Sequence, residues 1–273
     1  MRQYLDLLNK VMREGVDKPN RTGIDTRAIF LETMRFNLAD GFPIITTKKV
    51  NFDAVAAELL WFISGSRDVR ELQKMGCHIW DENAEADYWK PHAQFAGDLG
   101  RVYGVQWRHW RTADGKEFDQ LADVIARIKK TPNDRRLIVT AWNPGELTEM
   151  ALPPCHMFFQ FFVANGKLSL SMYQRSCDMF LGVPFNISSY ALLLSMIAQV
   201  TDLEPGEFVH VLADTHIYHN HFDQVREQLT RTPKSLPQLW LNPEVHDIDS
   251  FTMADIRLDG YQHDPFIKAK MAV

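Results

Sequence analysis

Cysteine is scarce in this 273-residue sequence, and long uncharged apolar runs are missing. The three cysteines, Cys77, Cys155 and Cys177, cannot build a disulfide framework, and their odd number leaves at least one thiol outside any intramolecular disulfide. The first fifteen residues carry charges throughout and lack the apolar segment and cleavage site of a signal peptide. The longest apolar stretch, residues 190–200, is interrupted by polar side chains and is shorter than the roughly 20 residues that span a bilayer. We therefore expect a cytoplasmic protein with no membrane segment.

An excess of positive charge is also missing. Thirty Lys and Arg stand against 35 Asp and Glu, which gives a formal net charge of −5. Long nucleic acids require a broad basic face, so this balance does not favour them as partners, although local arginine clusters remain possible. Repeats, low-complexity segments and flexible linkers are not found either. With 45% apolar and 24% charged residues, the composition indicates one globular domain over residues 1–273.

Apolar residues at helical spacing predict helices over residues 3–14 and 51–64. Residues 186–200 are apolar on nearly every side, which predicts a buried helix. A third amphipathic helix is marked by Phe118, Leu121, Ile125 and Ile128.

Strands are expected between these helices. The clearest signal is a hairpin of residues 157–164 and 167–174, because Asn165-Gly166 suits the positive φ angles of a two-residue turn. Shorter strands are predicted at 137–142 and 208–212, whereas residues 84–102 show little periodicity and predict a surface insertion. We expect an α+β fold: a single domain with a mixed sheet, one long buried helix and surrounding helices.

Cys155 is the strongest candidate for a reactive group. Pro153 and Pro154 stiffen the backbone before it, and the predicted strand that follows would fix its position. The hairpin would bring Cys155 close to Arg175, whose guanidinium would favour the nucleophilic thiolate. The alternative is a buried structural cysteine.

Four arginines are expected in loops or at the ends of strands: Arg21, Arg135, Arg136 and Arg175. Guanidinium groups bind phosphate through a planar fork, so together they indicate a site for one small anion; solvated surface charge is the alternative. Arg135 and Arg136 are adjacent and would point to opposite sides of a strand, so both reaching one phosphate would require an irregular backbone.

Several other polar residues allow two interpretations each. His216 and Tyr218 share one face of an extended segment and suit a sugar hydroxyl or a satisfied buried pair. Periodicity favours Glu58 as the polar edge of its helix, the alternative being a buried acid with a raised pKa. Asn186 is either the N-cap of the buried helix or an amide that reads a heterocycle. The spacing of His216, His219 and His221 fits no standard zinc pattern, so we expect no metal.

In their order along the chain, these segments resemble the thymidylate synthases, and the resemblance runs from residue 1 to 273. The matching segments are Asp17–Arg27, Thr46–Lys48, Glu58–Phe62, Ile79–Asp81, Asp98–Trp107, Asp134–Arg136, Pro153–His156, Gln174–Asp178, Phe180–Asn186, Asp214–Tyr218 and Ile267–Val273.

The resemblance implies a chemistry. The Cys155 thiolate adds to carbon 6 of the uracil ring of dUMP, carbon 5 then attacks the one-carbon unit of 5,10-methylenetetrahydrofolate, and hydride from the folate gives dTMP and dihydrofolate. The implied catalytic residues are Cys155, Glu58, Tyr103, His156 and Asp178. The implied dUMP contacts are Arg21, Arg135, Arg136, Gln174, Arg175, Ser176, Cys177, Asp178, Asn186, His216 and Tyr218.

The resemblance also implies the cosubstrate site and the assembly. The folate contacts would be Lys48, Asn51, Ile79, Trp80, Asn83, Asp178, Leu181, Gly182, Phe185, Ala272 and Val273. The C-terminal tail would close over the site and exclude water. Arg135 and Arg136 would reach the site of a partner subunit, which implies a homodimer whose sheets pack back to back.

Four positions depart from the commonest bacterial pattern: Asn51, Asn83, Leu212-Ala213 and Lys270-Met271. They bear on folate affinity and tail closure rather than on the chemistry at Cys155.

Three other functions are alternatives. A dUMP hydroxymethylase would use the same thiol and deliver water in place of hydride, and Asn186 favours uracil over cytosine in either enzyme. A hydrolase pairing Cys155 with His216 would need an oxyanion hole, and no glycine-rich turn accompanies Cys155. A nucleotide- or RNA-binding module would need stacking aromatics on a basic face, which the sequence does not show.

Overall fold

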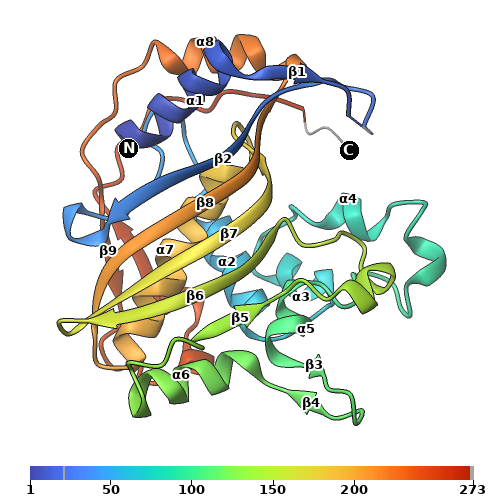
Figure 1. Ribbon diagram of the computed structural model, residues 1–273, viewed down its shortest axis with the longest axis vertical. Helices are drawn as coiled ribbons and strands as arrows, with labels where there is room; N and C mark the ends of the chain where they lie inside the picture. Colours follow the sequence, from blue (N-terminus) through green and yellow to red (C-terminus); the bar gives the residue numbers. More distant parts are fainter. Residues whose placement is uncertain (21, 271–273) are drawn as a thin grey trace.

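The computed structural model describes residues 1–20 and 22–270, and a six-stranded mixed sheet forms its centre (Figure 1). The neighbouring strands β7 and β8 are parallel and the other pairs are antiparallel, which confirms the predicted mixed sheet. In spatial order the strands are β1 (Val16–Lys18), β2 (Thr26–Asn37), β8 (Glu204–Tyr218), β7 (Lys167–Asp178), β6 (His156–Ala164) and β5 (Ile138–Thr140).

Helices cover one face of this sheet. The long helix α7 (Gly182–Val200) lies against β7 and β8, and α2 (Phe52–Ile63) packs on α7 (Figure 1). At one end α1 (Arg2–Glu14) packs near α8 (Phe222–Leu229), and at the other α6 (Gln120–Lys130) lies beside β5. The remaining α-helices and strands are α3 (Val69–Lys74), α4 (Asp81–Ala84), α5 (Tyr103–Arg108) and the pairs β3 (Trp110–Arg111) with β4 (Glu117–Phe118) and β9 (Gln238–Leu241) with β10 (Ile256–Asp259).

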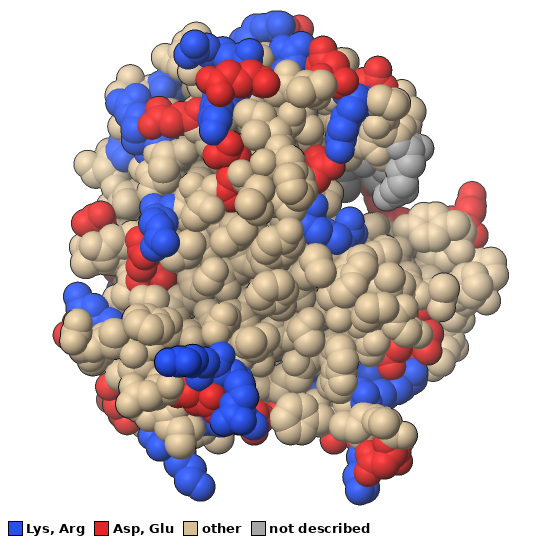
Figure 2. Space-filling view, in the orientation of Figure 1, with Lys and Arg blue, Asp and Glu red and all other residues tan. Residues whose placement is uncertain are grey.

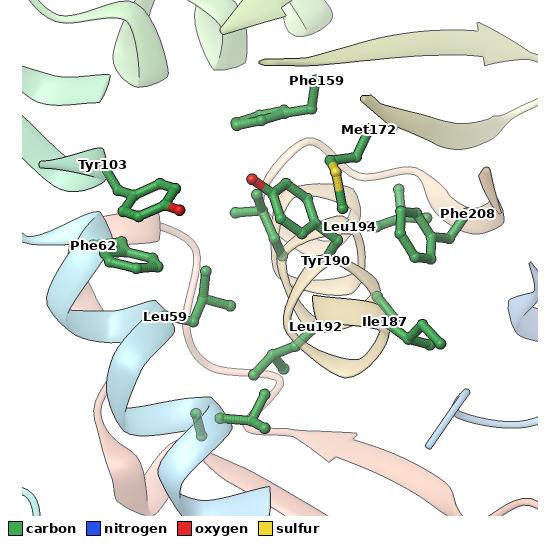
Figure 3. Close-up of a cluster of buried hydrophobic side chains, with 14 of the residues drawn as sticks. Leu59, Phe62, Tyr103, Phe159, Met172, Ile187, Tyr190, Leu192, Leu194 and Phe208 are labelled. Carbon is green, nitrogen blue, oxygen red and sulfur yellow. The ribbon is translucent and has the colours of Figure 1, made fainter. Parts of the chain in front are cut away.

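The apolar composition of α7 follows from its place between the sheet and α2. Figure 3 shows Ile187, Tyr190 and Leu194 of α7 among side chains of the sheet such as Phe159 and Phe208. Full burial of a large apolar side chain contributes roughly 1.5–3 kcal/mol, so this layer is a main source of stability. Among the described residues α7 is the one helix long and apolar enough to cross a membrane, yet 83% of that stretch is buried inside the domain. Packing in the core accounts for its composition.

The predicted hairpin is confirmed. Asn165 and Gly166 have φ angles of 52° and 72°, and Ala164 pairs with Lys167 across the turn. A left-handed backbone at both turn positions is what Asn-Gly adopts at least cost.

Other expectations are corrected by tertiary contacts. Helix α6 begins only at Gln120, because Asp119 caps it, and Phe118 lies exposed in β4. Residues 84–102 are a surface segment only in part: most of residues 85–97 are exposed, whereas Trp89 and residues 98–102 are buried in the core. The twelve-residue strand β2 was not predicted.

The topology brings distant parts of the chain to one edge of the sheet. His156 at the start of β6 pairs with Gln174 of β7, and Asp178 at the end of β7 pairs with His216 near the end of β8. Helix α7 begins four residues after β7 ends. The residues at this edge form the candidate site, and Figure 2 shows the surface hollowed on the side between β1 and α4.

Candidate active site

Cys155 lies directly before β6, half-buried at this edge of the sheet. Its backbone N–H donates to the Tyr103 hydroxyl at 2.8 Å, and its carbonyl accepts from the Arg175 N–H at 2.8 Å. Both hold the backbone on either side of the thiol. Cys77 and Cys177 are fully buried instead, and the described residues contain no disulfide. Cys155 is thus the cysteine placed to react.

The Arg175 guanidinium lies beside the loop that carries Cys155, as the hairpin predicted. Its Nε donates to the carbonyl of Pro154 at 2.8 Å and a terminal nitrogen donates to that of Pro153 at 3.1 Å. It also lies over the Trp142 ring, 5.2 Å from the ring centre. The cation is therefore fixed beside the loop that carries the thiol, and its remaining donors suit an anionic ligand.

Aromatic and imidazole rings pack behind Cys155. The His156 ring stacks on Tyr103, with 4.1 Å between ring centres, and its Nδ1 shares a 2.7 Å hydrogen bond with the Tyr190 hydroxyl. Burial, with a smaller contribution from His210, lowers the pKa of His156 to about 3, so His156 is neutral at pH 7. Burial raises the pKa of the Tyr103 hydroxyl above its usual range, and the nearby Cys155 adds to this effect. Figure 3 shows the hydroxyl ends of Tyr103 and Tyr190 pointing toward the same space.

Glu58 is a buried acid rather than the polar edge that periodicity favoured. It is 8% exposed on α2, and its Oε1 accepts from the Trp80 indole N–H at 2.7 Å. Burial raises the pKa of Glu58 to about 7, because the charged form loses its hydration, and the Trp80 hydrogen bond only partly opposes this. A carboxyl group with this pKa can both release and take up a proton near neutral pH.

A hydrogen-bond relay fixes Asn186. Gln174 donates from its amide nitrogen to the Ser176 carbonyl and to Asn186 Oδ1, at 2.9 and 3.0 Å. The opposite end of the Gln174 amide accepts from His210 Nε2 at 2.8 Å. Asn186 lies within α7, one turn after its start, so the N-cap interpretation is wrong. With Oδ1 held by Gln174, the orientation of the Asn186 amide is set before any ligand binds.

The end of β8 supplies a second polar group. His216 and Tyr218 contact each other edge to face with ring centres 5.2 Å apart, and His216 Nδ1 lies 3.1 Å from Asp214 Oδ1. The His216 hydrogen bond, together with Lys18, lowers the pKa of Asp214 to about 2. The predicted extended segment is confirmed, and it ends at the same edge of the sheet as Asp178.

Two of the remaining expected dUMP residues lie next to each other on β7. Ser176 is half-buried, whereas the Cys177 side chain is fully buried and contacts the Gln174 carbonyl. Any ligand contact of Cys177 therefore comes through its backbone.

The expected folate residues form two groups. Asp178 accepts from the backbone N–H groups of Phe180 and Leu181 at 2.9 and 3.2 Å, and a Cβ added at Gly182 would meet nothing nearer than Asn186 Oδ1 at 3.8 Å. Phe185 is half-buried on the next turn. A side chain at position 182 would thus lie in contact with both Asn186 and Asp178.

The second group comes from residues 48–83. Ile79 is 38% exposed next to the buried Trp80, and Asn83 is half-buried on α4. Asn51 caps α2 by accepting from the Ala54 N–H. Lys48 is buried with its ammonium over the Phe180 ring and donates to the Phe180 carbonyl; burial lowers its pKa to about 7.

Arg135 and Arg136 do not approach Cys155 of their own chain. They lie exposed in a turn before β5, which supplies an irregular backbone, and Arg136 pairs with Asp134. The Arg135 carbonyl accepts from Gln160, five residues along β6 from Cys155, or about 16 Å at the usual strand rise.

Some expected residues lie outside the described part of the chain. These are Arg21, Ala272 and Val273. Within residues 1–20 and 22–270, no three His, Cys, Asp or Glu side chains are grouped to hold a metal ion.

The site thus combines a fixed thiol, a nearby cation, an oriented amide and a carboxyl group with a near-neutral pKa. Such a set can add a nucleophile to an electron-poor ring and manage the protons. The sequence pattern did not indicate His210 and Tyr190, which reach Gln174 and His156 through contacts across the core. Finally, a family model described as thymidylate synthase matches residues 2–273.

Proposed function

The chain belongs to the thymidylate synthase family, and from this premise we propose that it methylates carbon 5 of dUMP with 5,10-methylenetetrahydrofolate, releasing dTMP and dihydrofolate. The observation that carries the proposal is the position of Cys155. Its backbone is fixed by Tyr103 and Arg175, and the Arg175 guanidinium lies beside its loop.

Each residue would have a separate role in the reaction. The Cys155 thiolate adds to carbon 6, which makes carbon 5 nucleophilic. Asn186 holds the N3–H and O4 edge of the ring, and Glu58 exchanges protons through water as charge develops at O4. Arg175 binds the phosphate, and His216 with Tyr218 binds the 3′-hydroxyl. The folate, held between Ile79 and Phe185, supplies the one-carbon unit and the hydride.

The decisive experiment incubates the protein with dUMP and methylenetetrahydrofolate and follows dihydrofolate by absorbance, with dTMP identified by mass. Formation of both products in equal amounts supports the proposal. Release of hydroxymethyl-dUMP without dihydrofolate would identify the hydroxymethylase instead. The absence of any nucleotide product would contradict both.

Asn186→Asp is expected to change base preference. A protonated aspartate can reverse the donor–acceptor pattern of the amide, so the ratio of kcat/KM for dUMP over dCMP should fall about 100-fold or more. Asn186→Ala is the matched control, because it removes the contacts without reversing them and should weaken both substrates. An unchanged ratio in Asn186→Asp would remove Asn186 from base recognition.

We further propose a homodimer that uses the open face of the sheet. Figure 2 shows a centre of this face without charged residues and charges around its rim. Phe162 is 67% exposed there and Ile138 is 44% exposed, and both lie on strands that form the sheet. Arg135 borders a depression that Phe162 and Val209 also line. A second copy placed on this face would cover the apolar centre and receive the arginine.

A mixing experiment tests the shared site. Cys155→Ser dimers and Arg135→Ala/Arg136→Ala dimers should each be inactive, or nearly so. After subunit exchange at equal amounts, half of the dimers are hybrids with one complete site each, so activity should return to about one quarter of wild type. If the arginines served their own chain, no site would be complete and no activity would return.

The same proposal places the enzyme in the cytoplasm, where a reduced Cys155 is maintained.

A further inference from the structure

Two segments that are far apart in the sequence run side by side next to the site. The Arg101 N–H donates to the Glu149 carbonyl at 2.8 Å, and the Ala151 N–H donates to the Leu99 carbonyl at 3.0 Å. Between them Gly100 has a φ of +71°, and a Cβ there would lie 2.1 Å from the Glu149 carbonyl oxygen. The approach is thus closer than any side chain at position 100 would allow.

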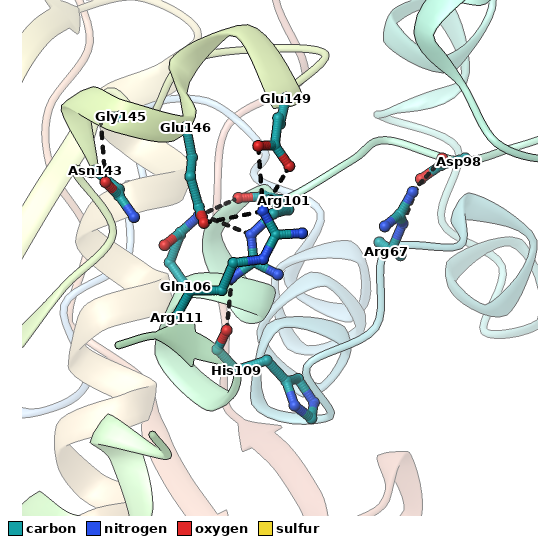
Figure 4. A network of polar contacts seen from close by, with 10 residues as sticks. All are labelled: Arg67, Asp98, Arg101, Gln106, His109, Arg111, Asn143, Gly145, Glu146 and Glu149. Carbon is teal, nitrogen blue, oxygen red and sulfur yellow. Dashed lines mark hydrogen bonds and ion pairs between the residues drawn. The ribbon is translucent and has the colours of Figure 1, made fainter. Parts of the chain in front are cut away.

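A buried ion pair locks the same two segments together (Figure 4). Arg101 Nε donates to Glu146 Oε2 at 2.6 Å, and the two side chains are only 6% and 9% exposed. The Arg101 guanidinium also donates to the His109 carbonyl, and Gln106 donates to Glu146 at 2.7 Å. Arg111 reaches the other oxygen of Glu146 at 3.3 Å. A buried charge pair needs such a complete set of partners, and once they are in place its geometry is strongly constrained.

Both segments lead directly into the site. Two residues after Arg101 comes Tyr103, and nine residues after Glu146 comes Cys155. The two meet again where the Cys155 N–H donates to the Tyr103 hydroxyl. The ion pair and this hydrogen bond therefore hold the two segments together at two points. The ion pair fixes how the segments are aligned, and this alignment places the Tyr103 hydroxyl opposite the Cys155 N–H.

We propose that Arg101 and Glu146 are positioning residues, whose buried pair fixes the Tyr103 hydroxyl against the backbone of the nucleophile Cys155. The effect of the pair on catalysis rests on the proposed function. The position that the pair gives to Tyr103 does not depend on that function. Breaking the pair leaves the Asn186 amide in place, because Gln174 of β7 holds it, so the change acts on the rate of thiol addition more than on binding.

Arg101→Met tests this proposal by removing the ion pair. Glu146 keeps its contacts with Gln106 and Arg111, so the variant does not leave a buried charge without a partner. Hydrogen exchange of the amides around Cys155 reports the Tyr103 contact without any substrate. Pro153 and Pro154 carry no N–H, so the two residues before Cys155 contribute no exchange signal of their own. The rate of covalent adduct formation with 5-fluoro-dUMP and folate reports the consequence, and the Kd for dUMP reports binding.

Arg108→Met is the matched control. Arg108 lies on the same helix as Tyr103, is 13% exposed and pairs with Asp119 and Asp249, none of which belongs to the segment carrying Cys155. We expect Arg101→Met to raise exchange at the Cys155 amide about tenfold and to slow adduct formation about tenfold, with the Kd for dUMP within threefold of wild type. Arg108→Met should change the exchange at Cys155 and the adduct rate less than twofold.

Equal effects of the two variants, or unchanged exchange at Cys155 in Arg101→Met, would overturn the proposal. If Arg101→Met does not fold, Glu146→Gln removes one charge and keeps the shape; it should raise this exchange at least threefold, and no change would likewise overturn the proposal. If wild type forms no adduct, the proposed function fails, while the exchange measurement still decides the positioning.

Discussion

Cys155→Ser is expected to lower dTMP formation by three orders of magnitude or more while the fold stays intact. A serine hydroxyl is not ionised near pH 7, so it cannot add to carbon 6 as a thiolate does. The side chain is half-buried and differs by one atom, so the loop held by Tyr103 and Arg175 should keep its position. The Tm should therefore stay within a few degrees of wild type, and dUMP should still bind.

Turnover, Tm and dUMP binding are measured on the same preparation. The control is Cys77→Ala, which removes a buried thiol whose sulfur contacts the backbone of Ala54 and Ile79. This variant should lose some stability and keep its activity. A Cys155→Ser protein with a near-normal rate, or a Cys77→Ala protein without activity, would contradict the assignment of the nucleophile.

Glu58→Gln is expected to lower kcat about 100-fold and to remove the dependence of the rate on a group with a pKa near 7. Glu58 is buried against Trp80, and its pKa is raised to about 7, which suits proton exchange at neutral pH. Glutamine keeps the shape and the acceptor oxygen for the Trp80 indole but cannot exchange a proton. The pH profile of kcat from pH 5 to 9 measures the effect.

Glu58→Gln lowers kcat, but it should raise the stability of the folded protein above neutral pH. Because the folded-state pKa of Glu58 lies above its ordinary value of 4.5, the folded protein keeps a proton that the unfolded chain has lost. Wild-type stability therefore falls as the pH rises from about 4.5 to about 7, by on the order of 3 kcal/mol for a shift of this size. Glu58→Gln lacks this loss, so it should have the higher Tm at pH 8 and a Tm close to wild type at pH 5.

A matched control is Glu71→Gln, since Glu71 is exposed on α3. It should leave both kcat and the pH dependence of the Tm unchanged. A Tm difference between Glu58→Gln and wild type that does not vary with pH would show that the acid is charged in the fold and would remove it from proton transfer.

Local chemistry determined several features directly. Asn165-Gly166 specifies a left-handed two-residue turn, so the hairpin of β6 and β7 could be predicted, and with it the closeness of Cys155 and Arg175. The continuous apolar pattern that ends at Val200 predicted a buried helix, because no exposed helix is apolar on every side. The match of ordered segments also indicated the family before any contact was known.

Contacts between distant segments decided the rest. The burial of Glu58 depends on Trp80 and on the surrounding core, and a single helix periodicity cannot distinguish a polar edge from a buried acid. Strand β2 is held by its pairing with β8, which no local pattern reveals. The orientation of Asn186 comes from Gln174 and His210, which lie on two different strands.

The sequence by itself thus determined which side-chain types are present and where the local turns lie, because both are written residue by residue. The tertiary structure alone decided the protonation and orientation of those side chains. A pKa depends on how much water the fold removes, and the direction of an amide depends on partners that only folding brings within hydrogen-bond distance.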